Sequence, residues 1–205
     1  EASTTFLNAL QFSLPIFFLG QYYSSTYVAY YALIVKVAVS PLSFISNSVS
    51  QINLNKVSEM IKNNCNVNSY LLRLILGLVV VVLFPTIILT FYGESLFSIV
   101  FGEDWRVAGQ LLVILMPAFA IRFIASTIST TILSSGKIYL TALWKIFAIL
   151  TSIIMYYAIK DEANIKNVFI IIAITDSIIY LIYMYISWHS IQTKKIKFIR
   201  KKNEQ

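Results

Sequence analysis

Six long apolar segments follow one another along this chain, and they constrain its fold more than any other feature. A membrane-spanning helix needs roughly 20 mostly apolar residues. The segments that meet this requirement run over residues 2–19, 27–49, 70–92, 107–133, 138–159 and 167–188. β-Branched runs inside them would favour strands in water, but in hydrocarbon a helix satisfies its own backbone groups. We therefore predict an all-α integral membrane protein, built as a six-transmembrane-helix bundle.

Composition agrees with a membrane protein and argues against several other classes. Hydrophobic residues make up 58% of the chain and charged residues only 12%, whereas about a quarter of the residues in a soluble domain are charged. With Cys65 as the only cysteine and His189 as the only histidine, the chain cannot form an internal disulfide or a Cys/His zinc site. Metalloprotease, phosphate-loop and Ser/His/Asp patterns are absent. We expect no enzyme activity, no metal and no cofactor.

Lysine and arginine gather on one side of the predicted bundle. Lys56 and Lys62 lie in the second connection, Lys137 lies in the fourth, and residues 194–205 form a basic tail. Because basic residues stay on the cytoplasmic side, both ends of the chain should be cytoplasmic. The net charge of +7 thus belongs to connections and tail, which argues against a nucleic-acid partner. We expect a six-helix lobe over residues 1–193, from a longer polypeptide because the chain opens without Met.

Four ionisable residues, Lys36, Arg122, Lys145 and Asp176, fall inside the predicted spans. Each charge costs on the order of 3 kcal/mol at the centre of a spanning helix, so something must compensate it. With three cations against one acid, an excess of roughly two positive charges remains in the interior, which favours binding of an anion. The alternative is that Asp176 pairs with one of these cations and that the charges only hold the helices together.

Helical spacing places further polar residues on the same faces as these charges. In the second span, steps of three and four connect Lys36 with Ser43, Asn47 and Gln51. We expect Lys36 and Arg122 to point into a shared cavity and Asp176 to contact one of the cations. The apolar third span should pack at the periphery. The candidate substrate-binding residues are Lys36, Arg122, Lys145, Asp176, Asn8, Gln11, Asn47 and Gln51.

Three pieces of the sequence carry a resemblance to a known family. Leu14-Pro15 precedes a span with Lys36 and Pro41 that ends in Ser48-Val49-Ser50-Gln51. Phe101-Gly102, Trp105 and Ala108 then lead into Ile114-Leu115-Met116-Pro117, and the segment from Ile132 to Lys137 follows. This order resembles the polysaccharide-unit flippases of the O-antigen type, within the multidrug/oligosaccharidyl-lipid/polysaccharide exporter superfamily.

The resemblance implies one lobe of a twelve-helix, two-lobe transporter in the bacterial inner membrane, with this chain as the C-terminal half. The implied substrate is an undecaprenyl-pyrophosphate-linked oligosaccharide. The implied partners are the missing N-terminal lobe, membrane lipids, a polysaccharide polymerase and a chain-length regulator. Four alternatives remain open: a teichoic-acid exporter, a lipid II flippase, a multidrug cation antiporter and a non-transporting scaffold of a polysaccharide assembly complex.

Overall fold

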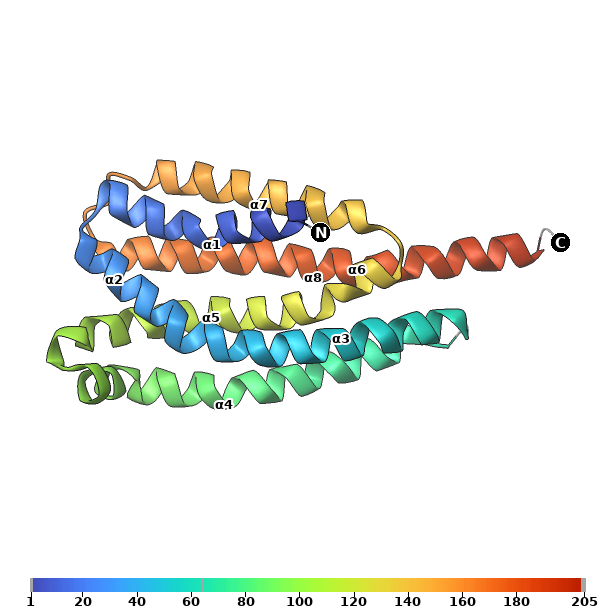
Figure 1. Cartoon of the computed structure of the whole chain (residues 1–205), viewed down its shortest axis with the longest axis horizontal. Coiled ribbons are helices and arrows are strands. Elements are labelled where there is room, and N and C mark those ends of the chain that lie inside the picture. Colours follow the sequence, from blue (N-terminus) through green and yellow to red (C-terminus); the bar gives the residue numbers. More distant parts are fainter. Residues whose placement is uncertain (1, 64, 204–205) are drawn as a thin grey trace.

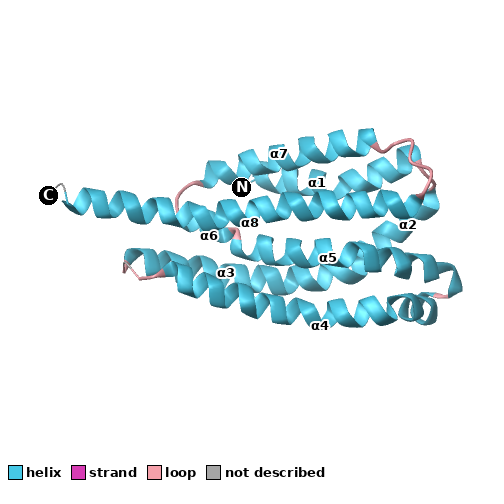
Figure 2. Cartoon of the chain, turned by 180° about the vertical axis from the view of Figure 1, so that it is seen from behind, coloured by secondary structure: helices cyan, strands magenta, loops and turns pink. Residues whose placement is uncertain are grey.

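Helices form nearly the whole chain. The computed structural model describes the backbone of residues 2–63 and 65–203, and most side chains between residues 7 and 190. Figure 2 shows helices joined by short loops, and the described residues contain no strand. The elements are α1 (Ala2–Tyr22), α2 (Ser25–Ile34), the π-helix η1 (Val35–Val39), α3 (Ser40–Lys62), α4 (Val67–Phe101), the 3-10 turn η2 (Glu103–Trp105), α5 (Arg106–Ile128), α6 (Thr130–Ser134), α7 (Ile138–Ala158) and α8 (Ile165–Asn203).

Five helical stretches of the described chain are long and apolar enough to cross a membrane: Ser25–Lys62, Val67–Phe101, Glu103–Ser134, Ile138–Ala158 and Ile165–Ser190. They match five of the six predicted spans, and the remaining one, residues 2–19, falls on the 21-residue helix α1. The helix ends differ from the predicted span ends, because a helix can continue beyond the hydrocarbon core of the membrane. The predicted span 27–49 thus continues to Lys62, and the predicted span 167–188 continues to Asn203.

The helices form two groups with α5 at the centre. In Figure 1, α1, α7 and α8 lie in one group and α3, α4 and α5 in the other, while α5 packs against both α4 and α8. We call the end that holds the α3–α4 connection and the continuation of α8 the tail side. The far side is the opposite end, where α1 joins α2, α4 joins α5 and α7 joins α8.

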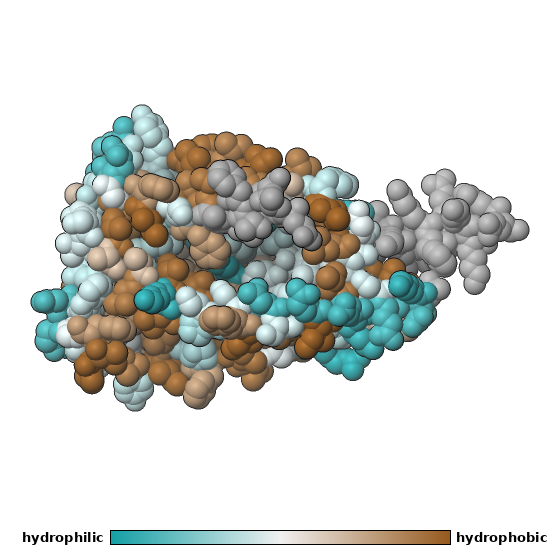
Figure 3. Space-filling model, viewed as in Figure 1, coloured by the Kyte–Doolittle hydropathy of each residue, from teal (hydrophilic) through white to brown (hydrophobic). Residues whose placement is uncertain are grey.

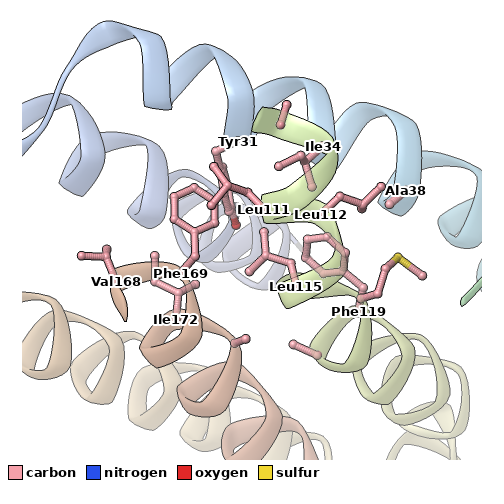
Figure 4. Close-up of a cluster of buried hydrophobic side chains, with 14 of the residues drawn as sticks. Tyr31, Ile34, Ala38, Leu111, Leu112, Leu115, Phe119, Val168, Phe169 and Ile172 are labelled. Atoms are coloured by element: carbon pink, nitrogen blue, oxygen red, sulfur yellow. The ribbon is translucent and has the colours of Figure 1, made fainter. Parts of the chain in front are cut away.

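The far half of the bundle is a dry apolar core. Figure 4 shows side chains of α2, α5 and α8 meeting there, with Tyr31, Leu111 and Phe169 among the fully buried ones. Two tyrosines, one between α1 and α2 and one in α2, also bind the far-side connections. The Tyr23 hydroxyl lies 3.1 Å from the Ile159 carbonyl and 3.0 Å from the Glu162 carbonyl. The Tyr30 hydroxyl donates to the Asp104 carbonyl at 2.9 Å. This half is therefore closed.

In the tail half, hydrogen bonds between α3 and the α5–α6 segment add to the apolar contacts of Leu42 with the cluster that includes Phe123 and Ile128. The Ser46 and Thr127 hydroxyls are hydrogen-bonded at 2.9 Å, Ser50 donates to the Thr127 carbonyl at 3.2 Å, and Asn53 donates to Thr130 at 2.9 Å. Nearer the tail side, Ser58 and Ser134 are hydrogen-bonded at 3.2 Å. We call this set the hydroxyl zipper: Ser46, Ser50, Asn53, Ser58, Ser126, Thr127, Thr130 and Ser134.

Two helices change their geometry where the dry half meets the polar half. The π-helix η1 lies between α2 and α3 and is followed by Pro41 in the first turn of α3. A π-turn holds one residue more than an α-turn, so it shifts the face that later residues present. α5 ends at Ile128, and Ser129 separates it from α6. These interruptions position the polar side chains described next.

The predicted peripheral position of the third apolar span agrees with the structure. Only 11% of the most apolar window of α4 is buried, the smallest share among the five stretches. Val80, Phe84 and Phe91 are among its exposed side chains. An exposed apolar helix of this length suits contact with lipid chains.

Candidate functional site

A cavity of about 1100 Å³ lies in the tail half of the bundle. It is bounded by α3, by the α5–α6 segment, by the first turns of α7 and by the middle of α8, with Phe12 of α1 at one edge. Figure 3 shows a hollow on this face between the two helix groups, with hydrophilic residues gathered along α3 beside it. The dry core of α2, α5 and α8 closes the far end. The cavity therefore lies in the tail half of the bundle and borders the apolar core through Val39 and Phe119.

Polar and aromatic side chains form most of the cavity wall. Hydroxyl and amide groups come from Ser43, Ser46, Asn47, Ser48, Ser50, Gln51, Ser126, Ser129, Thr130 and Thr141. Aromatic rings come from Phe12, Phe119, Phe123, Trp144, Tyr180 and Tyr183. Trp144 and Tyr183 stack with ring centroids 3.8 Å apart, and Trp144 Nε1 donates to the Ile179 carbonyl at 3.2 Å. Hydroxyls and flat rings together suit a sugar, which has both hydrogen-bonding and apolar surfaces.

Two cations line the cavity, and no acidic residue is among its described lining residues. Arg122 of α5 has its guanidinium carbon 3.7 Å from the centre of the Phe12 ring and 5.1 Å from that of Tyr180. These ring faces attract the cation and fix its position. Lys145 of α7 is 6% exposed and lines the same space. The described lining of the cavity is thus cationic, which favours an anionic ligand.

The structure brings together four of the eight residues predicted to bind substrate. Asn47, Gln51, Arg122 and Lys145 all line the cavity. Gln11 is buried in the bundle but does not line it. The side chain of Asn8 lies outside the described part of the chain.

Lys36 and Asp176 lie elsewhere. Lys36 is exposed, in η1, and does not line the cavity that holds Arg122. The regular spacing from Lys36 to Ser43 assumes a continuous α-helix, and the π-turn shifts Lys36 off that face. Asp176 is buried, at 8% exposure, but is also outside the cavity lining. The predicted contact between Asp176 and a cation is not among the ion pairs within 4.0 Å of the described residues.

Sequence reasoning missed several lining residues. Ser46 and Ser50 belong to the same helical face as Ser43 and Asn47, with spacings of three, one and three residues, so a wider stripe would have included them. Phe12 was not predicted, because its role depends on α1 lying beside the arginine of a helix 110 positions later in the chain. Aromatic residues in apolar spans give no sequence signal that separates packing from contact with a cation.

Comparison with known proteins gives a single family. The family model described as polysaccharide biosynthesis protein matches residues 2–110, which is more than half of the 205 residues. The matched region includes α1 to α4 and ends in the first turns of α5. No curated protein and no solved structure gives a significant match.

Proposed function

This chain belongs to the family of polysaccharide biosynthesis proteins, and from that premise we propose that it flips a lipid-linked oligosaccharide across the membrane. The observation that carries the proposal is the cationic, hydroxyl-rich cavity in the tail half of the bundle. Arg122 and Lys145 bind the pyrophosphate of an undecaprenyl-pyrophosphate carrier. The hydroxyl, amide and aromatic walls bind the sugars, and the lipid tail stays in the bilayer.

A flippase of this kind needs a second lobe, because alternating access moves one half of a transporter against the other. The exposed side of η1 and α3 supports such a neighbour. Lys36, Ser40, Asn47 and Gln51 are exposed there within an apolar stretch, and polar groups in a membrane face protein or water rather than lipid. In the complete two-lobe transporter, α1, α2 and α3 border the shared pathway.

Two of the other candidate functions fit the cavity less well. A cationic drug would meet Arg122 and Lys145 with no acid among the described lining residues, so the antiporter is disfavoured. A scaffold without transport would be packed and dry, whereas this bundle holds a cavity of about 1100 Å³. A teichoic-acid exporter and a lipid II flippase move anionic lipid-linked substrates, so the cavity suits them too.

Binding to the purified intact protein tests the proposal. We expect a polyprenyl diphosphate carrying an oligosaccharide to bind at least about tenfold more tightly than the same lipid as a monophosphate, because one further charged hydrogen bond is worth about 1.5–3 kcal/mol. Calorimetry in detergent measures both affinities. Inorganic pyrophosphate should compete, and a neutral alkyl glycoside of matched sugar content should not. Equal affinity for the neutral glycoside and the diphosphate would refute the pyrophosphate site.

The orientation gives a second prediction. Asn63 and Asn164 are exposed at opposite ends of the bundle, and the lysine and arginine bias assigns the tail side to the cytoplasm. In a Cys65→Ser background, Asn164→Cys should react with an impermeant thiol reagent outside intact cells. Asn63→Cys should react only after the cells are opened. Labelling of both from outside would contradict the assignment, and reaction of Asn63→Cys alone would reverse it.

A further inference from the structure

The lining of the cavity changes along its depth. The end that borders the apolar core, which we call the inner end, holds Arg122 beside Tyr180. Lys145 lies at a similar depth, because it follows Trp144, whose ring centroid is 5.4 Å from that of Tyr180. Both cations of the described lining therefore belong to the inner end.

The outer end of the cavity, nearer the tail side, is lined by uncharged residues. Thr130 lies about 12 Å closer to the tail side than Arg122, counted along α5 and α6 at 1.5 Å per residue. The hydrogen bond of 2.9 Å from Asn53 to Thr130 places Gln51 of α3 close to the depth of Thr130. Asn47 lies one helical turn nearer the inner end. The outer end consists of Asn47, Gln51, Ser126, Ser129 and Thr130.

Two amide side chains at the outer end differ from the hydroxyls around them. The α3 hydroxyls of the lining already bond protein groups, and they are Ser43, Ser46, Ser48 and Ser50. The side chains of Asn47 and Gln51 are exposed and take part in none of the hydrogen bonds between described residues. Each amide offers both donors and an acceptor. They are therefore free to pair with the hydroxyls of a ligand, which also donate and accept.

A lipid-linked oligosaccharide carries its groups in the same order as the cavity. In a leaflet its chain lies in the hydrocarbon, while its diphosphate and then its sugars lie towards water. From the apolar core outward, the cavity presents the cations first and the amides of α3 after them. The stacked rings of Trp144 and Tyr183 line the wall from the other helix group. A carrier from the tail-side leaflet therefore fits the cavity without turning over.

We propose that Asn47 and Gln51 form a glycan subsite at the outer end, and that the carrier binds with its diphosphate at Arg122 and its sugars towards the tail side. The inference rests on the proposed function, because it takes the diphosphate at Arg122 as given. The two amides contact sugar hydroxyls and leave the diphosphate to the cations. A site that hydrogen-bonds a substrate hydroxyl discriminates against a substrate that lacks it. Asn47 and Gln51 therefore determine which glycan is accepted.

Two lipids that differ only in their glycan test the subsite. The probes are a polyprenyl diphosphate that carries an oligosaccharide and the same polyprenyl diphosphate without sugar, and calorimetry of the purified intact protein gives both affinities. We expect Asn47→Ala and Gln51→Ala each to weaken binding of the glycan-bearing lipid about two- to tenfold, the effect of one neutral hydrogen bond. Affinity for the sugar-free lipid should not change. Arg122→Ala should weaken binding of both lipids by the same factor.

Asn55→Ala is the matched control. Asn55 follows Gln51 by one helical turn and is also exposed on α3, but it does not line the cavity. It should leave both affinities unchanged. Equal losses for both lipids in Asn47→Ala and Gln51→Ala, or no loss for either lipid, overturn the glycan subsite and leave the diphosphate site standing. Failure of wild type to bind both lipids overturns the proposed function, and the subsite falls with it.

Photolabelling of wild type tests the orientation without a variant. With a diazirine on the terminal sugar of the glycan-bearing lipid, we expect label on α3 and on the α5–α6 segment from Asn47 and Ser126 towards the tail side. Mass spectrometry of the digested protein locates the label. Label confined to the depth of Phe119 and Arg122 would place the sugars at the inner end and overturn the proposed orientation.

Discussion

Replacing Arg122 with alanine should abolish surface polysaccharide while the protein stays in the membrane. Arg122 is the cation that Phe12 and Tyr180 hold at the cavity wall. A charged hydrogen bond is worth about 1.5–3 kcal/mol, and a guanidinium can make two of them to a pyrophosphate, so we expect transport to fall about 100-fold or more. Removal of a cation from within an apolar helix also lowers the cost of insertion, so abundance should not fall. Cells that carry only the variant gene are assayed for polysaccharide and for membrane protein together.

Lys36→Ala is the matched control, because it removes a cation from the same apolar bundle at an exposed position outside the cavity. It should keep export close to normal, and Arg122→Lys should keep part of it. A structural role for Arg122 predicts another pattern, in which alanine leaves Asp176 uncompensated, costs about 3–5 kcal/mol and lowers protein abundance together with export. Normal export by well-expressed Arg122→Ala would rule out the cationic site. Loss of export by well-expressed Lys36→Ala would show that Lys36 is needed in the substrate pathway.

The largest effect on stability should come from Gly109→Ala. A methyl group at Gly109 would lie 2.6 Å from the Gly93 carbonyl oxygen and 2.7 Å from the Glu94 Cα atom. Both are backbone atoms of α4, so α4 and α5 must move apart to admit it. Overpacking of this kind costs about 1–3 kcal/mol, and each kcal/mol lowers the Tm of a chain of this size by roughly 2–4 °C. Thermal unfolding of the purified protein in detergent measures the change.

Gly77→Ala, in α4, is the matched control for Gly109→Ala. Nothing lies within 4 Å of a methyl group built at Gly77, which is exposed on α4. Alanine favours helix over glycine, so this variant should melt at the wild-type temperature or slightly above it. If Gly109→Ala melts at the same temperature as Gly77→Ala, the close approach of α4 and α5 at Gly93 and Gly109 does not contribute to stability.

The apolar runs were enough to place the helices, because every backbone group in hydrocarbon must bond within its own segment. The predicted span 138–159 differs by one residue from α7, Ile138–Ala158. Helix ends outside the membrane were not predictable in this way. The α3 helix continues through Lys56 to Lys62. Water can bond to backbone groups there, so the apolar content of the sequence no longer indicates where the helix ends.

The candidate site was predictable only where a helix is regular. Asn47 and Gln51 are four residues apart in α3 and reach the cavity together. Lys36 would join them in a straight α-helix, but it lies within the π-turn at Val35–Val39, and the sequence Val-Lys-Val-Ala-Val does not distinguish a π-turn from an α-turn. The position of Phe12 against Arg122 depends on packing between helices that are distant in the sequence. The periodicity of residues within one helix gives no information about that packing.

The hydroxyl zipper gives the two halves of the bundle different costs of opening. Separation of α2 from α5 in the far half would expose buried side chains such as Ile34 and Leu112 to water, at roughly 25 cal/mol for each Å² of apolar surface. In the tail half, Ser46, Ser50 and Asn53 would exchange protein partners for water, and that exchange is nearly balanced. The α5–α6 hydroxyls also bond carbonyls of their own segment, as Thr127 does with Phe123 at 2.7 Å. Beyond the apolar contacts of Leu42 and Val49, α3 is joined to α5–α6 by hydrogen bonds that water can replace. We therefore expect α3 to separate from α5–α6 at a lower cost than α2 from α5.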